Sequence, residues 1–94
     1  MNKSELSCNE IREMLSKASQ SIENQPKWAI ISLCHILDLI QFGFPRNQGA
    51  TVVAMTEKTV PGRKSKKRDA LVFETLVARA KEFHSQALEL LSQS

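Results

Sequence analysis

The stretch 26-PKWAIISLCHILDLIQFGFP-45 decides the fold, because its helical part is apolar on nearly every side. Eleven of the fifteen residues from Trp28 to Phe42 are apolar. The polar exceptions recur at every third position, so they wind around the helix and leave no continuous polar face. They are Ser32, His35, Asp38 and Gln41. Pro26 suits a first helical turn and Gly43 suits a left-handed helix cap. The sequence predicts a helix over residues 26–42 that other elements must cover.

Amphipathic patterns on both sides of this stretch predict two further helices. In residues 8–23 the apolar positions recur at three- and four-residue steps, at Cys8, Ile11, Leu15, Ala18 and Ile22. Ser7 and Glu10 form a capping box in front of them. Residues 69–91 repeat the pattern at Phe73, Leu76, Ala80, Phe83, Ala87 and Leu90. The predicted fold is therefore all-α, a small three-helix bundle in a single domain of residues 1–94.

The connector of residues 45–68 has a different character. Residues 50–59 (ATVVAMTEKT) are rich in β-branched side chains, which favours one short strand. A lone strand has unpaired edges, so it must pair with a partner's sheet or a second copy, fold as something else, or stay mobile. Residues 60–63 (VPGR) predict a type II turn. We expect a long, basic, mobile connector with room for one strand.

Charge is concentrated in this connector. Residues 46–68 carry seven Lys and Arg against one Glu, a net charge of +6, whereas the rest of the chain sums to −3. The cations are Arg46, Lys58, Arg63, Lys64, Lys66, Lys67 and Arg68. Such a cluster suits contact with nucleic-acid phosphate or an acidic protein surface, although solvated loops also carry such clusters. Residues 46–68 contain no Phe, Tyr or Trp, so a nucleic-acid contact here would be made to the backbone.

Ser32, His35 and Asp38 have the residue types of a hydrolytic triad. Side chains spaced by three on one packed helix lack an exposed nucleophile and an oxyanion pocket, so we interpret them as a polar seam. In that seam His35 and Asp38 neutralise each other or meet a neighbouring helix. The two cysteines and two histidines lack zinc-ligand spacing, and the glycines form no phosphate-binding loop. The sequence predicts no catalytic residue, no metal site, no cofactor and no enzyme activity.

The sequence predicts a cytoplasmic protein, because it shows no targeting signal and its cysteines suit a reducing compartment. No apolar run follows Met1 within the first ten residues, so we expect no secretory signal. Asp38 interrupts the longest apolar stretch, which argues against a membrane span. Two cysteines without close spacing are typical of a reducing compartment.

Two other predicted helices cannot cover an all-round apolar helix completely. We therefore expect a further interface, with a homodimer partner or a target protein, anchored by Trp28, Phe42 and Phe44. The alternative is that these aromatic side chains lie in the monomer core.

The leading hypothesis is a small non-enzymatic binding protein: an adaptor, regulator or inhibitor of a larger protein or protein–nucleic acid complex. Its size and charge separation are typical, by analogy, of phage or mobile-element modulators of host nucleic-acid-processing or defence enzymes. The alternative is a dimeric nucleic-acid-binding protein that contacts the phosphate backbone through residues 63–68. A hydrolase that uses Ser32 and His35 is a distant third.

Overall fold

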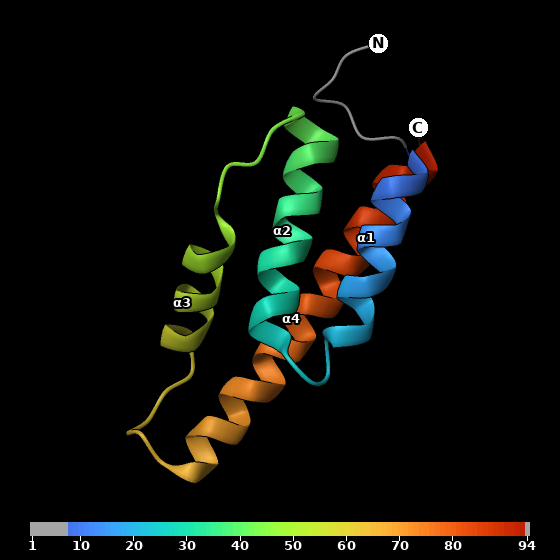
Figure 1. The fold of residues 1–94 in the computed structure, drawn as a ribbon. Helices are drawn as coiled ribbons and strands as arrows, with labels where there is room; N and C mark the ends of the chain where they lie inside the picture. The colour runs from blue at the N-terminus through green and yellow to red at the C-terminus, as the bar shows by residue number, and fades with distance from the viewer. Residues whose placement is uncertain (1–7, 94) are drawn as a thin grey trace.

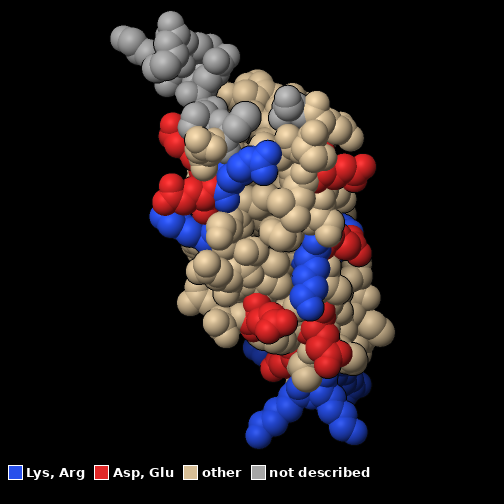
Figure 2. Space-filling model, turned by 90° about the vertical axis from the view of Figure 1, so that its right-hand side faces the viewer, with Lys and Arg blue, Asp and Glu red and all other residues tan. Residues whose placement is uncertain are grey.

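The computed structural model describes residues 8–93, which form four helices and no strand (Figure 1). The helices are α1 (Cys8–Ser21), α2 (Pro26–Phe42), α3 (Gly49–Thr59) and α4 (Lys66–Gln93). The molecule is elongated, with extents of 52 × 22 × 18 Å (Figure 2). The all-α prediction is confirmed, whereas the predicted count of three helices is wrong. Ser7, the predicted cap of the first helix, lies outside the described residues.

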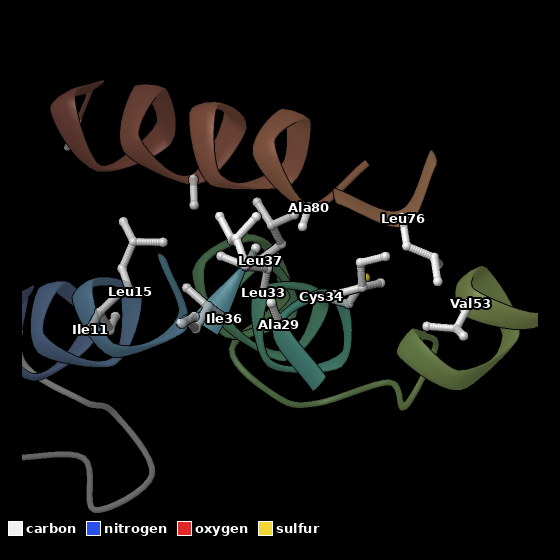
Figure 3. Packing of buried hydrophobic residues seen from close by; sticks show 14 of the residues in the cluster. Ile11, Leu15, Ala29, Leu33, Cys34, Ile36, Leu37, Val53, Leu76 and Ala80 are labelled. Atoms are coloured by element: carbon white, nitrogen blue, oxygen red, sulfur yellow. The ribbon is translucent and has the colours of Figure 1, made fainter. Parts of the chain in front are cut away.

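The apolar helix α2 is the centre of the bundle. It contacts α1, α3 and α4, whereas α1 and α3 do not contact each other. α1 and α3 flank α2 on opposite sides and α4 covers a third side (Figure 3). Each of the three neighbours therefore buries its apolar stripe against α2.

The α2–α4 interface depends on small residues in α4. Leu33 and Leu37 of α2 point toward Ala80 (Figure 3), and Ala80 and Ala87 are fully buried. The predicted α4 stripe is confirmed at Leu76, Ala80 and Ala87, and it continues at Val72 and Leu91. The placement of Phe73 in this seam is wrong, because Phe73 is 44% exposed. It lies about 100° around the helix from Val72, the residue that the stripe uses instead.

The end of α2 is fixed by a glycine and a buried carboxylate. Gly43 has φ of 80°, and its N–H donates to the carbonyls of Asp38 and Leu39 at 3.2 and 3.1 Å, as a left-handed cap requires. Asp38 is buried, and its Oδ2 accepts a hydrogen bond from the Arg46 backbone N–H at 2.9 Å. The interpretation of Asp38 as a partner of His35 or of a neighbouring helix is therefore corrected: it closes the loop after α2.

The predicted strand is wrong, because Gly49–Thr59 is the helix α3. Its buried positions recur at four- and three-residue steps, at Gly49, Val53 and Thr56, and the buried C-cap residue Val60 continues the spacing. The buried Thr56 hydroxyl donates to the Val52 carbonyl at 2.7 Å, so the hydroxyl is satisfied within the helix. A lone strand would leave backbone groups unpaired, whereas a helix pairs them internally. Burial on α2 therefore outweighs the β-propensity of the side chains.

Helix α4 begins three residues before the predicted start at Asp69. The Ser65 Oγ accepts a hydrogen bond from the Arg68 backbone N–H at 3.1 Å, which is the arrangement of an N-cap. Gly62 has φ of 105°, the left-handed backbone that the predicted turn needs. Lys66, Lys67 and Arg68 consequently belong to the first turn of α4 and not to the connector.

Candidate functional site

Four cations project from one end of the molecule, which we call the basic tip: Arg63, Lys64, Lys66 and Lys67. All four are exposed, and none makes an ion pair with any residue in 8–93. Figure 2 shows Lys and Arg gathered at this end of the molecule, where Figure 1 shows the turn before α4. Lys58 is also exposed and lies near this end, in the last turn of α3. The structure thus brings five of the seven predicted cations to one end, and none of the five makes an ion pair within residues 8–93.

The backbone around the tip adds positive potential. Lys66 and Lys67 occupy the first turn of α4, where the helix dipole is positive. Cations there oppose the dipole at a few tenths of a kcal/mol each. The tip therefore weakens the fold slightly instead of stabilising it.

Arg68 has a different role from its neighbours. It is half-buried, and its Nη2 donates to the Glu57 carbonyl at 2.8 Å, which joins the last turn of α3 to the first turn of α4. Its Nε is buried without a hydrogen-bond partner among the described residues. Of the five cations in residues 63–68, Arg68 is the one whose side chain joins two helices of the fold.

The segment between α2 and α3, which contains Arg46, begins at the end of α2 far from the turn before α4 (Figure 1). The Arg46 guanidinium lies 4.7 Å from the centroid of the Phe42 ring, and the rings of Phe42 and Phe44 are 6.4 Å apart. Both rings are about half exposed. The structure therefore separates the predicted aromatic anchors: Phe42 and Phe44 lie at the C-terminal end of α2, whereas Trp28 lies in its first turn.

An apolar groove of about 450 Å³ lies beside the basic tip, and we call it the tip groove. It runs between the first turn of α2 and the N-terminal half of α4. The buried Val72 and Leu76 form its base, and Trp28 and Phe73, 49% and 44% exposed, form its sides. Its polar edge consists of Gln25, Asp69 and an ion pair of 3.0 Å between Lys27 and Glu57.

A second groove of about 310 Å³ lies between α1 and α2, and Trp28 lines both grooves. The second groove is lined further by Met14, Lys17, Ile31, Ser32, His35 and Ile36. Ser32 and His35 are half-buried here, while Asp38 is engaged with the Arg46 amide. The structure therefore does not join these three residues into a relay.

Phe73 and the tip groove were missed by reasoning from the sequence. The sequence predicts Phe73 on the packing stripe because Phe73 precedes Leu76 by three residues. Val72 precedes Leu76 by four residues and fits the helical period equally well, and it is Val72 that is buried, with Phe73 beside it. Nothing in the local sequence indicates that Trp28 of α2 lies opposite Phe73.

Cys34 is buried in the core below these surfaces. Burial, followed by the nearby Asp38 carboxylate, raises the pKa of the Cys34 thiol to about 11, although Arg79 acts in the opposite direction. The thiol is therefore protonated at neutral pH and is a poor nucleophile. Among residues 8–93, no three His, Cys, Asp or Glu side chains are grouped closely enough to hold a metal ion.

Comparison with known proteins gives no assignment: no protein-family model, curated protein or solved structure matches the chain. Within residues 8–93, none of the four helices combines the length and the apolar character needed to cross a membrane. The basic tip and the two grooves are the candidate functional surfaces of the described residues.

Proposed function

We propose that the protein is a non-enzymatic helical binding protein that docks on a larger protein or protein–nucleic acid complex. It acts there as an adaptor, regulator or inhibitor, in the manner of small phage or mobile-element modulators of host enzymes. The basic tip is the observation that supports this proposal. Four exposed cations without ion-pair partners in residues 8–93 lie together at one end of a chain whose residues outside 46–68 are net acidic.

The energetics of the tip favour an external partner. Lys66 and Lys67 oppose the dipole of α4, and like charges at neighbouring positions repel each other. Arg68, one residue further along, is joined to α3, so the same segment does contain a cation that helps the fold. An anionic partner would offset the cost of the other cations and gain from them in affinity and association rate.

Two further parts of the proposal, the non-enzymatic function and the cytoplasmic location, have their own support. The engagement of Asp38 with the Arg46 amide supports a non-enzymatic function, because this carboxylate is not available to orient His35. The spacing of the two cysteines supports a cytoplasmic location. A homodimer remains a prediction.

The proposal is tested by capture from the lysate of the native host after nuclease treatment, with the full chain as bait. The tip variant carries Ala at Arg63, Lys64, Lys66 and Lys67. The charge-matched control carries Ala at Arg12, Lys17, Arg79 and Lys81, exposed cations on the body of the molecule. We expect the wild type and the control to retain the same proteins and the tip variant to lose them. Equal capture by all three baits would contradict the proposal.

The second candidate is a dimeric protein that contacts the nucleic-acid backbone through residues 63–68. The observation that favours it is the position of Lys66 and Lys67 at a helix N-terminus, where backbone amides and cations together suit a phosphate. Affinity for a DNA duplex of arbitrary sequence would then fall steeply with salt, and the tip variant would reduce that slope. Fluorescence anisotropy over a salt series measures the slope, and a tip variant with unchanged affinity would exclude this function.

A further inference from the structure

We propose that the tip groove receives an apolar side chain from an acidic segment of a partner protein, while the carboxylates of that segment lie against the basic tip. The inference rests on the proposed function and names the chemistry of the partner. It is a two-part interface: one apolar anchor and one charged contact, side by side on α4.

The tip groove has the properties of an anchor site. Its volume of about 450 Å³ lies within the usual range of ligand pockets, about 300–1,000 Å³. Val72 and Leu76 supply a buried aliphatic base, and the half-exposed Trp28 and Phe73 gain contacts when the groove is filled. Large aromatic side chains around a desolvated pocket are typical of residues that dominate binding energy.

The groove and the tip lie within reach of one short segment. Lys66, Asp69 and Phe73 are spaced by three and four residues, so they lie on the same face of α4. Lys66 precedes Phe73 by seven residues, about 10 Å along the helix axis. A partner helix of three turns would therefore span both, with its anchor in the groove and its acidic residues one to two turns away.

The charges around the groove determine which residues of that segment lie over the groove and which lie at the tip. Lys27 is already paired with Glu57, and Asp69 adds a carboxylate at the same edge, so an anion is disfavoured over the groove itself. Beyond Asp69 the tip presents Lys66 and the other unpaired cations. Apolar residues therefore belong over the groove, and acidic residues belong at the tip.

Two other occupants fit this arrangement less well. A nucleic-acid strand lying in the groove would bring its phosphates against Asp69 and Glu57, and the aliphatic base offers nothing to a phosphate. A second copy that packed symmetrically through this face would present the same groove and the same basic tip, and so would offer no cluster of carboxylates to the tip. Charge complementarity thus favours an acidic protein segment.

The test selects a displayed library of random peptides of about 16 residues, long enough for a helix of about 24 Å, against the full chain. We expect enrichment of sequences that combine Asp and Glu with Leu, Ile or Phe. Trp28→Ser and Phe73→Ser, both at half-exposed positions, should each weaken the selected peptides about tenfold or more. Phe44→Ser, at an equally exposed aromatic position at the far end of α2, is the matched control and should bind as the wild type does.

The variants distinguish a failure of the groove inference from a failure of the proposed function. If the tip variant loses binding while Trp28→Ser and Phe73→Ser retain it, the groove inference is overturned and the proposed function stands. If the selected peptides bind the tip variant as they bind the wild type, the proposed function fails as well. Enrichment of neutral or basic peptides, displacement by a DNA duplex without loss in the groove variants, or a dimer that Phe73→Ser dissociates would each overturn the groove inference.

Discussion

Gly49 is the position where the packing of α3 on α2 can be tested most sharply. A Cβ added there would lie 2.6 Å from the Ile31 Cα, a backbone atom of α2, and 3.1 Å from the Ile31 Cγ1. Carbon atoms in ordinary contact are about 3.5–4.0 Å apart, so Gly49→Ala forces α3 away from α2 by about 1 Å. Overpacking of this kind costs about 1–3 kcal/mol. The substitution also improves helix propensity by at most about 1 kcal/mol.

We therefore expect Gly49→Ala to lower the free energy of unfolding by about 1–2 kcal/mol, out of about 5–14 kcal/mol for a domain of this length. Urea unfolding followed by circular dichroism should show a lower midpoint and an unchanged m-value. Ala54→Gly, at an exposed position of α3, is the control and should cost about 1 kcal/mol through helix propensity alone. A Gly49→Ala protein as stable as the wild type, or more stable, would refute the close packing of α3 on Ile31.

Three further predictions concern the loop after α2, the start of α4 and the buried thiol. Asp38→Ala should lower the free energy of unfolding, measured with urea, by about 1–3 kcal/mol, because it leaves the Arg46 backbone N–H without its acceptor. Asp38→Asn keeps an acceptor oxygen and should recover part of that loss. Thermal unfolding should show that Ser65→Ala destabilises the fold by about 1 kcal/mol through loss of the N-cap, whereas Lys66→Ala and Lys67→Ala each stabilise it by a few tenths of a kcal/mol. Because burial raises the pKa of Cys34 to about 11 from 9.0, the unfolded chain loses the thiol proton first as pH rises. The free energy of unfolding should then fall by up to about 3 kcal/mol between those two values, and Cys34→Ala should flatten that part of the pH profile. Unchanged stability in Asp38→Ala, destabilisation by the two lysine substitutions, or a pH profile unaffected by Cys34→Ala would each contradict the corresponding interaction.

Local signals in the sequence were sufficient for α2. Pro26 at its start and Gly43 at its end act through the backbone at those positions, so the predicted bounds agree with the structure. Residues 50–59 lack such a signal, and their β-propensity predicts a strand, which needs a neighbouring strand that the described residues do not contain. The spacing of Gly49, Val53, Thr56 and Val60 follows the helical period. This spacing favours a helix over a strand only when α2 is present to bury these four residues.

The candidate site also has one part that the sequence predicts and one part that depends on the tertiary fold. The basic cluster is contiguous in sequence, so its position as one charged unit was predictable from the sequence. The role of Arg68 was not, because its partner, the Glu57 carbonyl, belongs to the last turn of α3, whose residues have the β-propensity of a strand. The tip groove was equally hidden, since Trp28 and Phe73 come from different helices and meet only when α4 packs across α2.

The central claim, that a partner protein docks at the basic tip and the tip groove, is tested most directly by site-specific photo-crosslinking in the native cells. A photoreactive phenylalanine analogue replaces Phe73 in one protein and Phe44 in the other, and crosslinked peptides are identified by mass spectrometry. We expect the position at Phe73 to crosslink to a segment rich in Asp and Glu in one partner protein, and the crosslink to disappear in the tip variant. The position at Phe44 should not give that crosslink. Crosslinks from Phe73 only to nucleic acid or to a second copy of the chain, or the same crosslinks from both positions, would contradict the claim.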